Sequence, residues 1–211
     1  MRSCLFKCRF RRPDPPHYLV IPDVEEIYSE GARTFVEVEG WGDYLSGTTR
    51  PGHFRGVTTV VAKLFNIVMP DFAVFGRKDA HQAILIERMT RDLKFDVRIV
   101  TCPIVREPDG LAMSSRNRYL NPAQRQAALV LHRSLLRAQT LIERGESNAA
   151  VIREAMKEIF DSEPLVKVDY IELVDPTTLR PADPVRNGTL IAVAAYLGTT
   201  RLIDNWPVEI P

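Results

Sequence analysis

Along the chain, apolar positions follow two different spacings, and the change between them predicts the order of helices and strands. Short apolar or alternating runs that proline or glycine closes are typical of strands. In the first half such runs cover residues 17–21, 34–39, 72–75 and 96–102. The run at 17–21 is apolar throughout and is expected to be buried. The run at 34–39 alternates between apolar and polar residues and is expected to be half exposed.

Apolar residues spaced three and four positions apart predict the helices of the first half. Residues 79–93 place four of them on one face of a helix: Ala83, Ile86, Met89 and Leu93. Residues 57–68 predict an earlier helix, and residues 24–28 a short one. Since strand 72–75, helix 79–93 and strand 96–102 follow one another, we expect a parallel strand pair joined by a right-handed crossover.

The second half begins with a clear helix start. Asn121, Pro122 and Gln124 match the N-cap, the first helical position and the capping-box position. Further elements are expected as helices over residues 128–142 and 148–159 and as strands over residues 166–174, 189–197 and 201–205. These patterns predict an α/β domain over residues 17–117 and a smaller α+β domain over residues 118–211.

Composition and charge exclude several classes of protein. The 211 residues are 45% hydrophobic and 26% charged, which is ordinary for a globular chain and too apolar for a disordered one. Lys and Arg total 28 against 27 Asp and Glu, so the net charge of +1 excludes the strongly basic balance of a non-specific nucleic-acid binder. No apolar run approaches the ~20 residues of a membrane span. Cys4, Cys8 and Cys102 cannot build a disulfide framework, which indicates a reducing, cytoplasmic setting.

Residues 1–16 (MRSCLFKCRFRRPDPP) differ from the rest of the chain. They are rich in basic residues and proline and show no period, so we expect a disordered leader. The apolar stretch of ~7–15 residues that a signal peptide needs does not follow the cationic start. A metal site made of Cys4, Cys8 and His17 is the alternative, although three ligands at this spacing are unusual for zinc.

Three segments carry candidate chemistry, and the first is FGRKD at residues 75–79. A glycine at the carboxyl end of a strand, followed by a helix start, lies where open α/β sheets bind ligands. N–H groups of the first helical turn face an anion there, and Lys78 adds a charge suited to phosphate. Asp79 can cap the helix or accept ribose hydroxyls, and Gln82 lies three residues further on the same side. The alternative is a capped turn with solvated charges.

The second segment, residues 105–118 (VREPDGLAMSSRNR), places two serines beside an arginine in a loop that a glycine precedes. Hydroxyl and backbone N–H groups can hold phosphate oxygens, and a guanidinium can pair with them through two hydrogen bonds. Ser114, Ser115 and Arg116 are therefore candidate phosphate ligands. The alternative is a surface hairpin with a solvated arginine.

The third segment, residues 49–56 (TRPGHFRG), is a flexible basic loop before a helix. Its charges suit a carboxylate, and His53 is a candidate general base, although no partner for it is readable and a packing role is the alternative. His81 lies in the first turn of the helix after Asp79. His132, within an amphipathic helix, is expected to be structural. Paired-cysteine zinc patterns, the G-x-S-x-G elbow and the G-x-x-x-x-G-K-[ST] phosphate loop do not occur.

Three long motifs follow one another in a fixed order: RPGHFRGV with TVVAKLFNIV, then PDFAVFGRKDAHQ, then VREPDGLAMSSRNRYL. Together they resemble the pantoate–β-alanine ligase family, from about His17 to near the C-terminus. The resemblance implies an incomplete Rossmann-like parallel sheet of the nucleotidyltransferase type. It also implies a homodimer and an ATP-dependent reaction with Mg²⁺. In that reaction the pantoate carboxylate attacks the α-phosphate, and the amine of β-alanine then displaces AMP to give pantothenate.

The resemblance also assigns residues. The positions that match its ATP site are Gly76, Arg77, Lys78, Asp79, Val105, Met113, Ser114, Ser115 and Arg116. In this assignment Val105 and Met113 line the adenine, and Gln82 binds pantoate. The residues expected to carry the catalysis are Lys78, Ser114, Ser115 and Arg116. Both steps develop negative charge, which preorganised cations and N–H donors stabilise.

One part of the family pattern has no counterpart here. Family members begin with a strand and a loop of the form M-G-x-L-H-x-G-H, whose histidines bind the triphosphate, and they carry a second pantoate-binding glutamine. We therefore expect the 211-residue chain alone to make no pantothenate at a useful rate. The alternatives are a ligase completed from elsewhere and a non-catalytic remnant that retains the dimerising and C-terminal parts. A different adenylating enzyme is a weaker alternative, because Gln82 and the RPGHFRG loop argue against it.

Overall fold

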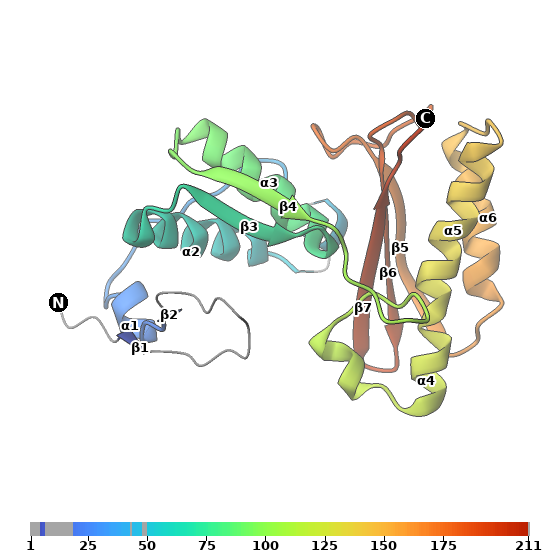
Figure 1. Cartoon of the computed structure of the whole chain (residues 1–211), viewed down its shortest axis with the longest axis horizontal. Helices are drawn as coiled ribbons and strands as arrows, with labels where there is room; N and C mark the ends of the chain where they lie inside the picture. Colours follow the sequence, from blue (N-terminus) through green and yellow to red (C-terminus); the bar gives the residue numbers. More distant parts are fainter. Residues whose placement is uncertain (1–4, 7–18, 43, 48–49, 211) are drawn as a thin grey trace.

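The computed structural model describes residues 5–6, 19–42, 44–47 and 50–210. Figure 1 shows two bodies side by side. One holds a small parallel sheet with two long helices, and the other holds an antiparallel sheet with its helices beside it. Along the chain, the small parallel sheet comes before the three-stranded antiparallel sheet.

The first body is built on a parallel strand pair. Strand β3 (Phe72–Gly76) pairs with β4 (Arg98–Cys102) residue by residue, and helix α3 (Ala80–Asp92) makes the connection between them. A single turn of 3₁₀ helix, η2 (Arg77–Asp79), joins β3 to α3. The expected parallel pair with a helical crossover is confirmed.

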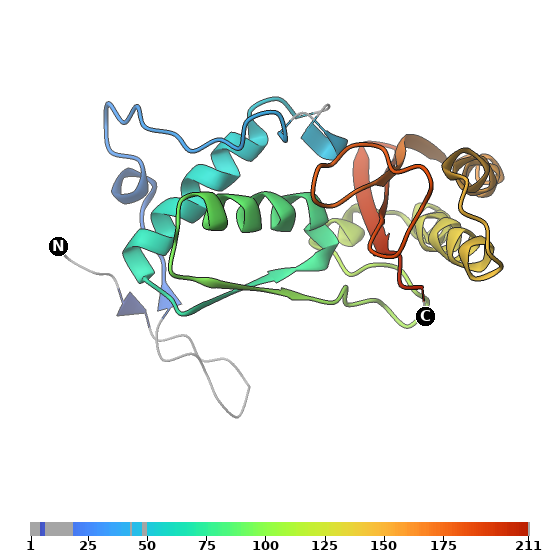
Figure 2. The ribbon, with the colours of Figure 1, turned by 90° about the horizontal axis from the view of Figure 1, so that it is seen from above.

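The described residues cover one face of this sheet. Helix α2 (His53–Val68) and α3 lie on the same side of the two strands, as Figure 2 shows. Ala73 and Phe75 point to that side and pack on the cluster of Val61, Ala62, Phe65, Ile86 and Met89. The alternate residues Phe72 and Val74 remain 60% and 65% exposed. Alternation along β3 therefore separates a packed face from an open one.

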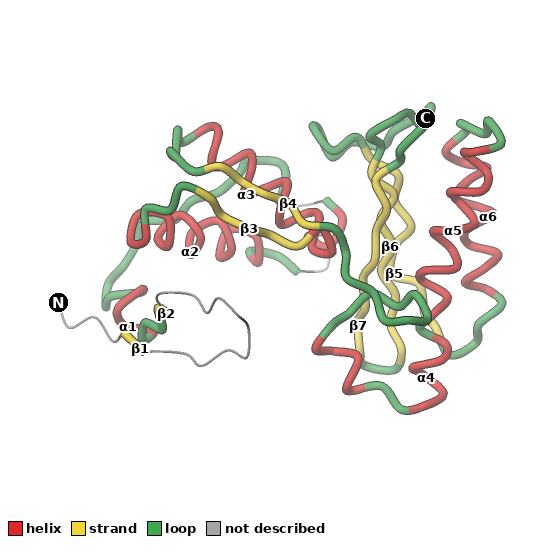
Figure 3. Tube along the Cα trace, in the orientation of Figure 1, coloured by secondary structure: helices red, strands yellow, loops and turns green. Residues whose placement is uncertain are grey.

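The second body is a three-stranded antiparallel sheet in the order β5 (Val166–Val174), β6 (Leu190–Leu197) and β7 (Thr200–Pro207). Helices α5 (Leu129–Glu143) and α6 (Ala149–Asp161) pack against it, and Figure 3 shows these helices in red beside the yellow strands. Their contact forms the largest core of the molecule, which includes Leu131, Ile152, Met156, Phe160 and Leu173. All three predicted strands are confirmed, and the last is longer than expected.

Helix boundaries in the second half follow the capping residues. Asn121 accepts a hydrogen bond from the backbone N–H of Gln124, and the Gln124 side chain accepts one from the Asn121 N–H, so the capping box of α4 (Pro122–Ala127) is confirmed. Asn148 caps α6 through two backbone N–H groups. A turn of 3₁₀ helix, η3 (Ser115–Tyr119), lies just before α4.

Near the N-terminus, one predicted strand is wrong and another is wrong in its expected burial. Residues 34–39 form no strand, because the backbone groups of Val36 bond to threonine side chains of α2 instead of a neighbouring strand. The N–H of Val36 donates to Thr59 Oγ1 at 3.0 Å, and Thr58 Oγ1 donates to the Val36 carbonyl at 2.6 Å. Within the run at 17–21, Leu19–Val20 form the strand β2, but Val20 and Ile21 are about half exposed rather than buried, and residues 17 and 18 lie outside the described residues.

Other element boundaries near the N-terminus also differ from the predicted ones. Strand β2 pairs with β1 (Leu5–Phe6), so this part of the expected leader is ordered in a strand. The remaining residues of that segment, with Cys4, Cys8 and His17, lie outside the described residues. The short helix α1 (Val24–Ile27) forms where expected. A 3₁₀ turn, η1 (Leu45–Gly47), precedes the predicted loop 49–56, and the last four residues of that loop are already the first turn of α2.

The two bodies share an apolar contact. Leu45 of η1 and Ala80 of α3 pack against the ends of β5 and β6, where Val174, Leu190 and Ala192 are buried. This contact places the amino end of α3 next to the antiparallel sheet. Within the described part of the chain, no helix combines the length and the apolar character needed to cross a membrane.

Packing against the main core predicts how two adjacent residues of α6 differ in their contribution to stability. Ile152 is fully buried and Val151 is 47% exposed. Replacing Ile152 by Ala should lower the free energy of unfolding by about 2–5 kcal/mol, because a cavity is left in the core. Urea unfolding followed by circular dichroism measures it. Val151→Ala, the matched control, should stay within about 0.5 kcal/mol of the original chain, and equal losses would contradict the assigned burial.

Candidate active site

The three segments with candidate chemistry converge on one pocket between the two bodies. From the turn after β3 the pocket is lined by Lys78, Asp79 and Gln82, and from the later loop by Ser114, Ser115 and Arg116. Arg50 and His53 line it from the start of α2. Residues more than sixty positions apart in the sequence thus face the same space.

The lining holds more cations than carboxylates, although the chain as a whole is nearly neutral: Arg50, Lys78, Arg116 and Arg201 stand against Asp79 and Asp204. Lys78 has no ion-pair partner among the described residues. Asp79 is the N-cap residue of α3, but its side chain makes no capping hydrogen bond, so the expected cap is not formed by the carboxylate. Both side chains are therefore available to a bound molecule.

Arg116 lies at the tip of the loop and contacts the opposite wall. Its Nη1 donates to the backbone carbonyl of Arg201 at 3.2 Å, and its backbone N–H donates to Ser114 Oγ at 3.2 Å. Both contacts are long and exposed, and hydrogen bonds of this kind contribute little to stability. A phosphate or carboxylate can replace them at small cost.

The base of the same loop is held firmly. The backbone N–H of Glu107 donates to the Leu111 carbonyl and that of Gly110 to the Glu107 carbonyl, so residues 107–111 form a tight turn with Leu111 buried. Gly110 has φ of +97°, and a Cβ there would lie 2.3 Å from the His132 ring. The His132 ring, for which the sequence predicts a structural role, packs so close to residue 110 that only glycine fits there.

His53 has a depressed pKa because of partial burial and the positive charges of Arg50 and Arg116, with Asp79 acting in the opposite direction. Its ring is therefore mostly neutral at pH 7. Arg55, from the same segment, does not line the pocket and stacks instead on Phe35, with its guanidinium 4.0 Å from the ring centre. Thr49 lies outside the described residues.

Several candidate residues stay outside this pocket. Gly76 and Arg77 flank it without lining it, and a Cβ on Gly76 would meet nothing within 4 Å. Val105 and Met113 lie next to each other, joined by a hydrogen bond from the Met113 N–H to the Val105 carbonyl at 2.9 Å. They are 66% and 49% exposed. Their expected contact with a base stays a prediction.

Strand β7 contributes residues that the sequence did not single out. Arg201, Asp204 and Asn205 line the pocket, together with Tyr170 of β5. Asp204 is 2% exposed and binds Arg106 through two hydrogen bonds of 2.7 and 3.0 Å. The sequence does hold a signal for them, since two adjacent polar residues interrupt the apolar strand LIDNW at residues 202–206.

His81 is buried at the inner end of the pocket. Its Nε2 lies 2.8 Å from the Trp41 carbonyl and so carries the hydrogen of that contact, while its Nδ1 has no partner among the described residues. The ring packs on Phe54 at 4.0 Å between centres. Burial lowers the pKa of His81 to about 4, so the ring is neutral at neutral pH.

Across residues 19–42, 44–47 and 50–210, no three side chains of His, Cys, Asp or Glu gather closely enough to hold a metal ion. The pocket instead gathers cations and hydroxyls, which is the donor set for an anion such as a phosphate group.

A family model described as "Pantoate-beta-alanine ligase" matches residues 10–207. The chain belongs to the pantoate–β-alanine ligase family. The match begins seven residues before His17, where the resemblance was expected to begin.

Curated relatives support this membership of the pantoate–β-alanine ligase family. Pantothenate synthetase of Koribacter versatilis is 54% identical over 188 residues, which are 89% of this chain and 65% of that protein. Pantothenate synthetase of Moorella thermoacetica is 53% identical over 189 residues, which are 90% of this chain and 67% of that protein. The chain therefore spans about two thirds of the length of these relatives.

Solved structures of the pantoate–β-alanine ligase family have the same fold. Pantothenate synthetase from Thermus thermophilus matches with a TM-score of 0.85 and 45% identity, over 90% of this chain and 68% of that one. The ligase from Francisella tularensis, described as complexed with beta-gamma ATP and beta-alanine, matches with a TM-score of 0.63 and 29% identity, over 87% and 61%.

The neutral, buried state of His81 predicts a loss of stability in acid. Because the folded pKa of about 4 lies below the ordinary 6.5, the unfolded chain binds a proton first, and stability falls as pH drops from about 6.5 to 4. The loss from His81 should reach about 3 kcal/mol at most. Urea unfolding at pH 7.5, 5.5 and 4 measures it.

His81→Gln is the matched variant for this test, because glutamine retains a donor for the Trp41 carbonyl and does not titrate. Its stability should depend less steeply on pH than that of the original chain. Some slope should remain, because burial also lowers the pKa of His53 and His132. An unchanged slope in His81→Gln would contradict the assignment to His81.

Proposed function

We propose that this chain carries the nucleotide- and pantoate-binding part of an ATP-dependent ligase that joins pantoate to β-alanine through a pantoyl adenylate. The observation that supports it most is the pocket in which Lys78, Ser114, Ser115 and Arg116 face one another across the gap between the two bodies. The membership of the pantoate–β-alanine ligase family supports the choice of ATP, pantoate and β-alanine as the substrates.

In this proposal the positive lining holds the triphosphate. Lys78 supplies a charge without a competing ion pair, and Arg116 exchanges its long contact to the Arg201 carbonyl for phosphate oxygens. Asp79, free of any capping bond, accepts ribose hydroxyls, and Gly76 and Arg77 support the turn that carries Lys78. Val105 and Met113, which lie next to each other and are exposed, cover the adenine. Mg²⁺ enters bound to the phosphates of ATP.

Pantoate lies beside Gln82, which lines the pocket one turn into α3. Its carboxylate attacks the α-phosphate of ATP and pyrophosphate leaves. The amine of β-alanine then attacks the acyl carbon and AMP leaves, which gives pantothenate. Arg50 lies on the same wall as His53 and supplies a positive charge for a substrate carboxylate.

We also propose a homodimer that acts in the cytoplasm. The extended residues 34–39 bond to α2 through Val36, and the side chains of Phe35 and Glu37, on the alternate positions, are exposed. A second chain that pairs along this segment would give those positions strand partners. The cytoplasmic setting rests on the cysteine content given above. Light scattering coupled to gel filtration should give about twice the mass of one chain, and one mass would contradict the dimer.

Two assays separate the ligase from a non-catalytic remnant. The first measures equilibrium binding of ATP·Mg²⁺ to the 211-residue chain by calorimetry, where we expect binding that pantoate strengthens. The second measures AMP release in a fusion of this chain with the part of the Koribacter versatilis relative that the match leaves out. Release that needs both pantoate and β-alanine supports the ligase. No binding and no release would favour the remnant.

Lys78→Ala should lower AMP formation in the fusion by roughly 10²-fold, because a charge that stabilises the developing negative charge on the phosphate is removed. The rate under saturating substrates measures the loss. Lys167→Ala removes an exposed lysine of β5 outside the pocket and should leave the rate unchanged. Near-normal turnover of Lys78→Ala would refute the role of Lys78.

The loop at residues 109–117 should close over the nucleotide from its tip. Leu111 is buried, Gly110 is packed on His132, and the Asn117 side chain donates to the Ala112 carbonyl at 3.2 Å, so movement is expected at residues 114–116 between these fixed points. Hydrogen exchange with and without ATP·Mg²⁺ should show new protection at residues 114–116 and none at residue 111. Equal protection of residues 114–116 in both states of a chain that binds ATP would count against closure.

A further inference from the structure

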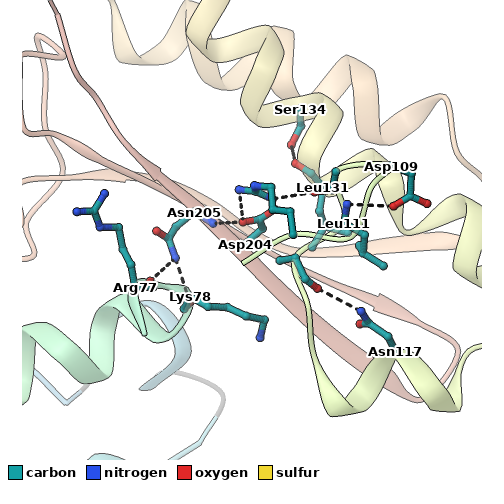
Figure 4. Close-up of polar contacts among 12 residues, drawn as sticks. Arg77, Lys78, Asp109, Leu111, Asn117, Leu131, Ser134, Asp204 and Asn205 are labelled. Atoms are coloured by element: carbon teal, nitrogen blue, oxygen red, sulfur yellow. Dashed lines mark hydrogen bonds and ion pairs between the residues drawn. The ribbon is translucent and has the colours of Figure 1, made fainter. Parts of the chain in front are cut away.

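A side chain of the second body reaches the turn that carries Lys78. Asn205 of β7 is 3% exposed, and its Nδ2 lies 2.9 Å from the carbonyl of Arg77 and 3.0 Å from the carbonyl of Lys78 (Figure 4). Two carbonyl oxygens accept only from a donor, so the amide NH₂, and not its oxygen, faces the turn. Both hydrogens of one amide group are thus used on two consecutive peptide units of η2.

Further hydrogen bonds connect Asn205, through Asp204 and Arg106, to the base of the Ser114–Arg116 loop. Its backbone N–H donates to Asp204 Oδ1 at 2.8 Å, and Asp204 binds the guanidinium of Arg106 through both of its oxygens. Arg106 Nη1 also donates to the Gly110 carbonyl at 3.0 Å. A continuous polar chain therefore runs from the base of the Ser114–Arg116 loop through Arg106, Asp204 and Asn205 to the turn at Lys78.

The buried amide of Asn205 lowers the stability of the fold unless its hydrogen bonds compensate. Its Oδ1 is buried without a partner among the described residues, and an unpaired buried oxygen costs about 1–3 kcal/mol. An apolar side chain of similar size would avoid this loss. What the amide gives in return is the pair of hydrogen bonds to η2.

We propose that Asn205 is a positioning residue of the active site, which holds the η2 turn in the conformation that directs Lys78 into the pocket. Arg106 and Asp204 fix the place of Asn205 relative to the Ser114–Arg116 loop. The chain of contacts sets the distance between the two predicted phosphate-binding segments. The part of this inference that concerns ATP rests on the function proposed above.

The test compares Asn205→Ala with Asn187→Ala in the 211-residue chain. Asn187 is an exposed asparagine of the same body, outside β7's contact with η2, and its side chain accepts a hydrogen bond from the Ile210 N–H. The first readout is the amide NMR resonances of Lys78 and Asp79, whose nitrogens follow the two bonded carbonyls. We expect both to shift or broaden in Asn205→Ala and to stay in place in Asn187→Ala.

Asn205→Asp separates donation from packing, because it retains the shape and places an oxygen opposite the two carbonyls. A donor role predicts that Asp disturbs the Lys78 and Asp79 resonances at least as much as Ala does. A packing role predicts that Asp restores them. Resonances of β5 and β6 that stay unchanged show that each variant is folded. Lys78 and Asp79 resonances that do not move in either Asn205 variant, or that Asp restores, overturn the proposal.

The second readout is the affinity for ATP·Mg²⁺ by calorimetry. Asn205→Ala should weaken binding about tenfold, and Asn187→Ala should not change it. If the turn is disturbed and the affinity is unchanged, the role of Asn205 in positioning Lys78 for ATP is refuted. If the original chain binds no ATP, the proposed function fails, and the NMR comparison alone decides whether Asn205 holds the turn.

Discussion

The ion pair between Arg106 and Asp204 is the contact on which the arrangement of the pocket depends. Asp204 is almost completely buried on β7, while Arg106 belongs to the segment that leaves β4 of the first body. Loss of one partner would leave an uncompensated buried charge, which typically costs about 3–5 kcal/mol. The two bodies therefore cannot separate at this point without a large penalty. Figure 1 shows that the segment after β4 leads directly to the second body.

The arginines and lysines at and beside the pocket differ in whether a carboxylate pairs with them. Arg106 and Arg201 are neutralised by Asp204 and Asp169 and act as structure. Lys78 and Arg116 have no such carboxylate partner among the described residues, and they lie on the two segments that the anchored frame holds in place. A chain with a net charge of only +1 thus concentrates uncompensated positive charge at one place. A local field of this kind attracts an anionic ligand without making the whole surface basic.

The sequence predicts those parts of the fold and site that short-range spacing controls. The β3–α3–β4 unit and the capping box of α4 follow from periods and caps between residues close in the chain, and both are confirmed. A strand was wrongly predicted at residues 34–39, because alternation leads to a strand only if a partner strand is present. Here Thr58 and Thr59 form hydrogen bonds with the backbone groups of Val36 instead. Asn205 was missed because its partners, the carbonyls of Arg77 and Lys78, lie 128 and 127 positions away.

Carbonyl oxygens near the amino end of a helix point along the axis away from the positive end, and each carries a partial negative charge. The carbonyls of Arg77 and Lys78 belong to η2, directly before α3. In the function proposed above a phosphate lies beside Lys78, and carbonyl oxygens left without a donor near it would repel its negative charge and weaken its binding. The amide of Asn205 engages both oxygens from the side of β7 and leaves the side chains of Lys78 and Asp79 to the pocket. A neutral amide does this without adding a cation that would compete with Lys78 for the ligand, which is the physical reason for asparagine rather than lysine or arginine at this point of the strand.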